Sequence, residues 1–78
     1  MSKKAKLVWN FNGPDALKTA EHHLIHLNEF SEMESIPFLS NGTEKVTELA
    51  FEAFVIVDLK WVDTLRTKLK PNQGYLVE

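Results

Sequence analysis

The feature that most constrains the fold is the longest apolar run of the chain, from Glu48 to Asp58. It is rich in β-branched and aromatic residues and contains no strand breaker, so it predicts a β-strand. One alternating set of its side chains is wholly apolar, and the other begins charged and ends apolar. This pattern is typical of a strand at the centre of a sheet whose second face is only partly solvated. The apolar set is Leu49, Phe51, Ala53, Val55 and Val57, and the mixed set is Glu48, Ala50, Glu52, Phe54 and Ile56.

A chain of 78 residues has room for one domain, residues 1–78, with one small core. It contains no cysteine, which excludes disulfides, thiolate metal sites and a thiol nucleophile. This composition fits a reducing cytoplasm, where we expect the protein to reside. Polar residues from Asn10 onward interrupt any signal-peptide core, and no run is long enough to span a membrane, so we expect no membrane partner. A net charge of −2 is also less basic than polyanion-binding proteins normally are.

The first part of the chain predicts a strand followed by a helix. Residues Lys4 to Phe11 alternate, with a strongly apolar set on one side. Pro14 and Asp15 suit the first turn of a helix, which runs to about Glu34. Its apolar stripe at the 3.6-residue period predicts an amphipathic helix that covers a sheet. The stripe comprises Ala16, Leu17, Ala20, Leu24, Leu27, Phe30 and Ser31, with His23 on its flank.

The next part predicts a hairpin. The apolar piece Ser35–Ser40 contains a proline, which confines it to an edge strand or its first residue. Asn41-Gly42 is a strong two-residue turn signal, which would lead through Thr43–Thr47 into the long strand. The alternative is a looser loop over residues 41–45, with the second strand starting nearer Val46.

The last part predicts a second helix and a final strand. Asp58 can cap the helix, whose apolar seam is Leu59, Val62, Leu65 and Leu69. Pro71-Asn72-Gln73-Gly74 ends it, and Tyr75–Glu78 forms a short strand. The order is therefore β-α-β-β-α-β. This is the ferredoxin-like or split βαβ arrangement of the α+β class, usually a four-stranded antiparallel sheet with two helices on one face.

Three histidines on the first helix are the most conspicuous candidate site. His22 and His26 are four residues apart and share a face with Glu29, so metal binding through these three side chains is one alternative function. The preferred interpretation is a solvated helix face, because the chain offers no fourth ligand. We accordingly expect no metal site and no cofactor. The serines show no nucleophile-elbow pattern, and Glu44, Glu48 and Glu52, which follow strand spacing on one face, are better explained as protection of a sheet edge than as acid–base catalysts. The preferred interpretation is therefore non-enzymatic.

Part of the sequence resembles the RNA-recognition motif. Ala53-Phe54-Val55-Ile56-Val57 resembles the end of that family's central-strand signature, and Leu7-Val8-Trp9-Asn10-Phe11 resembles its first-strand partner. The resemblance implies nucleic-acid binding on the open sheet face. However, Ala50 and Phe51 stand where the family has a basic residue and a glycine, and Glu52 replaces its first exposed aromatic. One aromatic beside a carboxylate is a poor stacking platform, so nucleic-acid binding is the least favoured alternative.

The remaining candidate is the sheet face that the helices would leave open. There we expect Val8, Ala50, Phe54 and Ile56, joined by either Tyr75 and Val77 or Leu76. A small chain gains most from burying such a face, which predicts an interaction or regulatory module that forms a homodimer or binds another protein. A second hypothesis is a ligand-binding or enzyme-like pocket between the facing sheets of a dimer, built on Asn10, Glu52 and Tyr75. Trp61 is a further candidate anchor. The predicted binding residues are Val8, Asn10, Glu52, Phe54 and Ile56.

Overall fold

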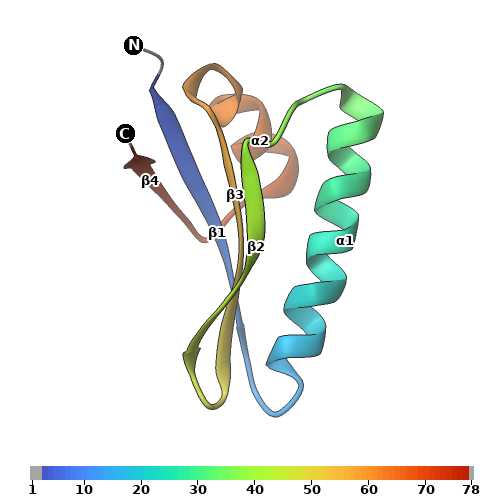
Figure 1. Cartoon of the computed structure of the whole chain (residues 1–78), viewed down its shortest axis with the longest axis vertical. Coiled ribbons are helices and arrows are strands. Elements are labelled where there is room, and N and C mark those ends of the chain that lie inside the picture. The colour runs from blue at the N-terminus through green and yellow to red at the C-terminus, as the bar shows by residue number, and fades with distance from the viewer. Residues whose placement is uncertain (1–2, 78) are drawn as a thin grey trace.

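The computed structural model describes residues 3–77, which form one four-stranded sheet and two helices (Figure 1). The elements are β1 (Lys4–Asn12), α1 (Ala16–Glu34), β2 (Ser40–Thr47), β3 (Ala50–Asp58), the 3-10 turn η1 (Leu59–Trp61), α2 (Val62–Leu69) and β4 (Gln73–Val77). All neighbouring strands are antiparallel in the order β2-β3-β1-β4, so β1 and β3 lie in the middle. The prediction of an α+β chain with this kind of sheet is confirmed. Neither helix in residues 3–77 has the length and apolar character that a membrane span requires.

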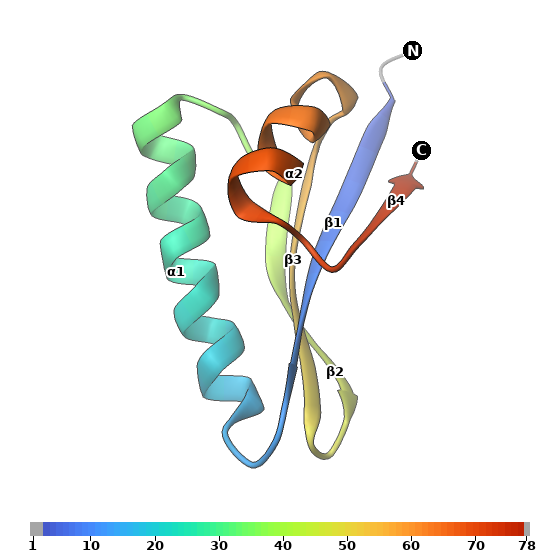
Figure 2. The ribbon, with the colours of Figure 1, turned by 180° about the vertical axis from the view of Figure 1, so that it is seen from behind.

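The hydrophobic core lies between one face of the sheet and both helices; in Figure 2, α2 lies in front of the strands and α1 lies to their left. Alternate residues of β1 and β3 supply the sheet side, as their period of two requires. Helix α1 contributes Ala20 and Leu27, and α2 contributes Leu65, all at most 1% exposed. Leu17, which the predicted stripe included, is 41% exposed and lies outside the core. The buried core residues are Leu7, Trp9, Ala20, Leu27, Ile36, Ala53, Val55, Val57 and Leu65.

The predicted hairpin at Asn41-Gly42 is wrong. Both residues lie within β2, opposite Val55 and Phe54 of β3, and the segment before Ser40 forms no strand. Pairing with the long strand β3 overrides the local turn preference of the dipeptide. The alternative, a loop over residues 41–45, is also wrong, because these residues pair along their length.

The turn between β2 and β3 is formed by Glu48 and Leu49 instead. The hydroxyl oxygen of Thr47 accepts a hydrogen bond from the Leu49 amide at 3.3 Å, and the Leu49 carbonyl accepts one from the Gly13 amide at 2.7 Å. Gly13 has φ of +111°, which only glycine adopts readily, so it can turn β1 into α1 at this point. The predicted core position of Leu49 is therefore wrong: its side chain is 56% exposed in the turn.

The cap that the sequence predicts for the second helix lies on the 3-10 turn η1 instead, because α2 begins only at Val62. The Oδ1 atom of Asp58 accepts a hydrogen bond from the Lys60 amide at 3.1 Å, which caps η1 before α2 begins. Leu65 is fully buried, whereas Leu59 at the start of the predicted seam is 38% exposed. The last strand begins two residues earlier than predicted, at Gln73, and the predicted strand residue Glu78 lies outside the described residues.

Candidate functional site

The face of the sheet opposite the helices is the first candidate site, and we call it the open face. Directly opposed residues in an antiparallel sheet share a face, so the register defines its members. Val8 is opposite Phe54 and Lys6 is opposite both Ile56 and Tyr75. The register therefore places Tyr75 and Val77, rather than Leu76, on this face. The open face includes Lys4, Lys6, Val8, Asn10, Ser40, Gly42, Glu44, Ala50, Glu52, Phe54, Ile56, Gln73, Tyr75 and Val77.

Phe54 lies at the centre of the open face beneath a charged pair. The Lys6 ammonium is 4.7 Å from the centre of the Phe54 ring and 2.9 Å from a carboxylate oxygen of Glu44. On the β2 side the ring lies over Gly42, where an added Cβ would come within 3.3 Å of it. The long Lys6 side chain thus spans β3 to reach β2 and covers part of the ring. Phe54 is half-buried as a result.

The five predicted binding residues differ in accessibility. Val8 lies on the open face as expected but is only 1% exposed, so its neighbours already cover it. Phe54, Ile56 and Glu52 are half-buried, and Asn10 is exposed. Phe54 and Ile56 are therefore the apolar groups of this set that a partner could reach.

Asn10 and Glu52 are directly opposed and line a shallow hollow of about 230 Å³ at one end of the sheet. The backbone N–H of Asn10 donates a hydrogen bond to the side-chain oxygen of Asn72 at 2.9 Å. Tyr75 does not line this hollow, and its hydroxyl donates to the Gln73 side-chain oxygen at 2.6 Å. Within one chain the structure therefore does not bring together the three residues of the pocket hypothesis.

His22, His26 and Glu29 lie in a row along α1 and do not surround a common point. The Nε2 atom of His26 is 3.0 Å from Nε2 of His22, and its Nδ1 atom is 3.0 Å from a carboxylate oxygen of Glu29. His22 and Glu29 thus contact opposite sides of one imidazole ring, so the three donors do not converge on a point. Among residues 3–77, no three His, Asp or Glu side chains form a group that could hold a metal ion.

His23 is the one histidine that packs against the sheet. Its ring is 5.3 Å from the Trp9 ring and 5.4 Å from the Phe11 ring, centre to centre. Its buried Nε2 atom has no hydrogen-bond partner within residues 3–77. Burial lowers the pKa of His23, and the nearby His26 and His22 lower it further. The ring is therefore neutral at neutral pH and acts as a packing group.

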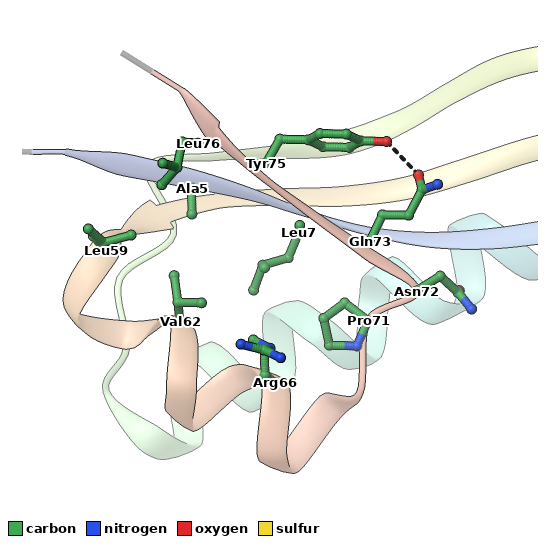
Figure 3. Close-up of a pocket in the computed structure, with 11 residues that line it drawn as sticks. Ala5, Leu7, Leu59, Val62, Arg66, Pro71, Asn72, Gln73, Tyr75 and Leu76 are labelled. Atoms are coloured by element: carbon green, nitrogen blue, oxygen red, sulfur yellow. Dashed lines mark hydrogen bonds between the residues drawn. The ribbon is translucent and has the colours of Figure 1, made fainter.

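Sequence reasoning missed a groove of about 340 Å³ on the helix side of β4, which Figure 3 shows in close-up. Leu7, Val62 and Arg66 lie beneath the strand, and the Tyr75 ring lies on its other side. Leu76 and Leu59 border the groove at one end, and Leu76 is 73% exposed. Pro71 and Asn72, which connect α2 to β4, also line the groove. Its lining residues are Ala5, Leu7, Leu59, Val62, Arg66, Pro71, Asn72, Gln73, Gly74, Tyr75 and Leu76.

Trp61 is half-buried and packs against the core, with Lys60 over its ring at 5.4 Å. It is therefore largely committed to packing within the chain. Comparison with protein-family models, curated proteins and solved structures gives no match for this chain.

Proposed function

We propose that this chain is a small, non-enzymatic interaction module of ferredoxin-like fold that forms a homodimer through its open face. The observation that carries the proposal is that no second layer covers this side of the sheet in residues 3–77, and the half-buried Phe54 and Ile56 lie at its middle. The ferredoxin-like assignment is supported by the element order and by the strand order β2-β3-β1-β4.

The arrangement of apolar and charged side chains on the open face resembles that of a protein interface. Phe54, Ile56 and Tyr75 provide apolar and aromatic surface, and charged side chains surround them. An apolar centre with a polar rim is the usual arrangement of such interfaces, and aromatic residues often supply their anchors. A chain this small also has a marginal core, so burying these groups against a partner would add a substantial share of its stability.

The charges on the open face favour a second copy as the partner. Lys4 lies towards one end of β1 and Glu52 on β3 lies towards the other end, whereas Lys6 and Glu44 are already paired with each other within the chain at 2.9 Å. A two-fold axis near Phe54 would place the lysine end of one copy over the acidic end of the other. A face that carries both signs at separate ends is self-complementary in a symmetric dimer.

The test is the molar mass in solution, measured by light scattering or sedimentation over a range of concentrations. We expect the molar mass of the wild-type protein to rise above the 9.0 kDa of one chain as its concentration increases. Phe54→Lys should weaken this association, because it places an ammonium group at the centre of the interface. Ile25→Lys is the matched control: it makes the same kind of change at a side chain that is 58% exposed on α1.

Circular dichroism must first show that each variant is folded. If Phe54→Lys unfolds the chain, Glu52→Lys provides the second test, because it reverses a charge at the acidic end without removing an apolar group. Association that neither variant weakens relative to Ile25→Lys would refute the open face as the interface. The wild-type protein could instead be monomeric and bind another protein that both variants fail to bind. That result would identify this face as a surface for a different partner.

A further inference from the structure

The two edges of the sheet differ in how they are protected. Natural proteins blunt exposed edges with charges, prolines or bulges, because free backbone groups there pair with other strands. The β2 edge has Glu44 and Lys45 and a shift of register between Lys45 and Thr47. The β4 edge, Gln73–Val77, contains no charge, proline or bulge. It pairs only with β1 among the described residues, so about half of its backbone amides and carbonyls point away from the sheet.

Apolar side chains accompany this unprotected edge. Leu76 projects towards the helix side and is 73% exposed, and Tyr75 projects towards the open face and is 48% exposed. Beside Leu76, the groove continues along the strand to Gly74. Gly74 has no side chain, and Leu7 occupies the space beneath it: an added Cβ would come within 3.3 Å of the Leu7 side chain.

We propose that β4 pairs antiparallel with β4 of a second copy, so that two four-stranded sheets join into one of eight strands. The register that pairs all five residues puts Tyr75 opposite Tyr75 on the two-fold axis. Gly74 is then opposite Leu76 of the second copy, and Gln73 is opposite Val77. This contact uses the backbone edge of β4, whereas the open-face contact centres on Phe54, although Tyr75 borders both; a chain that makes both contacts forms a tetramer where the two axes intersect.

The register explains three features together. Opposed residues share a face, so each exposed Leu76 lies beside the Gly74 of the other copy, which has no side chain to obstruct it. The two Tyr75 rings form a cross-strand aromatic pair on the opposite face. The free backbone groups of β4 gain partners, which is the general attraction between exposed edges.

Cross-linking tests the register directly, because the natural chain contains no cysteine. In Tyr75→Cys, the two thiols lie on directly opposed residues, whose separation of about 5 Å is within reach of a disulfide. Gln73→Cys is the matched control: it is on the same face and also exposed, but its two copies would be four positions apart along the strand, about 13 Å. We expect Tyr75→Cys to form a covalent dimer under mild oxidation at least tenfold faster than Gln73→Cys.

A second variant, Leu76→Lys, should block the contact, because lysine is a common edge protector and would bring an ammonium group into a groove that already contains Arg66. Met33→Lys is its control, at a side chain that is 80% exposed on α1. Leu76→Lys combined with Tyr75→Cys should slow cross-linking, whereas Met33→Lys should not. Equal cross-linking rates for Tyr75→Cys and Gln73→Cys would overturn the proposal. Tyr75 and Gln73 also lie on the open face, so both rates are measured in the Phe54→Lys background, which separates this result from the open-face test.

Discussion

The indole N–H of Trp9 donates a hydrogen bond to the carbonyl oxygen of Leu69 at 2.9 Å, which joins β1 to the last residue of α2. The side chain of Trp9 is 4% exposed, so the bond is shielded from water. Helix α2 has only eight residues and leaves its final carbonyl groups without partners within the helix. The Trp9 bond satisfies one of them and fixes where α2 ends relative to the sheet.

Replacing Trp9 with phenylalanine should therefore destabilise the protein. The change leaves the Leu69 carbonyl without its donor and removes part of a buried ring, for an expected loss of about 2 to 3 kcal/mol in the free energy of unfolding. Urea denaturation measures this loss. Trp61→Phe is the matched control, because the Trp61 indole nitrogen has no hydrogen-bond partner within residues 3–77. A loss of equal size in both variants would show that the Trp9 hydrogen bond contributes nothing measurable.

The residue that follows α2 offers a stabilising change. Lys70 adopts a left-handed conformation, with φ of 47°, and its amide donates to the Arg66 carbonyl at 3.2 Å. Glycine adopts this conformation without the penalty that an L side chain incurs. Lys70→Gly should raise the free energy of unfolding by about 1 kcal/mol. Lys70→Ala removes the same charge but keeps the penalty, so it should show no such gain. Equal effects of the two changes in thermal denaturation would contradict the conformational explanation.

The Lys6–Glu44 pair over Phe54 should contribute only modestly. Side-chain exposures of 23% for Lys6 and 50% for Glu44 mean that water screens much of the attraction. Lys6→Ala should cost about 0.5 to 1 kcal/mol, because it removes both the ion pair and the cation–π contact. Glu44→Gln should cost less, because it keeps Lys6 over the ring, and high salt should reduce its effect further. Urea denaturation of each variant at low and high salt provides the measurement, and an unchanged cost of Glu44→Gln at high salt would argue against an electrostatic origin.

The sequence predicted the parts of the fold that depend on periodic burial. The apolar alternation of β1 and β3 identified the two strands that form the sheet side of the core, and the stripe on α1 identified the helix surface that covers them. The β2–β3 hairpin could not be predicted in this way. Asn41-Gly42 has a strong turn preference, but Gly42 instead provides the space that the Phe54 ring occupies. That requirement comes from a residue twelve positions away and is invisible to a local pattern.

Like the fold, the candidate sites could be predicted from the sequence only in part. Strand parity placed Phe54 and Ile56 on the open face, and Tyr75 was one of two alternatives that the register then decided. The coverage of Val8 could not be predicted, because it depends on side chains from the strands on either side of β1. The groove along β4 could not be predicted either. It results from the spacing between α2 and β4, which a sequence period does not specify.

The stability of the protein should depend on pH through His23. Its pKa is lowered in the folded state by burial and by the nearby His26 and His22, whereas in the unfolded chain it has the ordinary value of 6.5. Below that value the unfolded chain binds a proton that the folded chain does not, so the free energy of unfolding should fall as pH decreases from about 6.5 towards the folded-state pKa. One proton limits this slope to about 1.4 kcal/mol per pH unit, and above pH 6.5 the His23 contribution should be constant.

Carboxyl groups also titrate as the pH falls, so the test of His23 is a difference between proteins. His23→Leu keeps an apolar group against Trp9 and Phe11 and removes the titration, and its stability relative to wild type should increase as pH falls below about 6.5. His22→Gln, which changes an exposed histidine of the same helix, should follow the wild-type profile more closely. The His23 ring signals in an NMR titration report the pKa directly, and their midpoint should lie below 6.5. A midpoint at or above 6.5 would mean that the charged ring is accommodated between Trp9 and Phe11, and the pH dependence expected of His23 would then be absent or reversed.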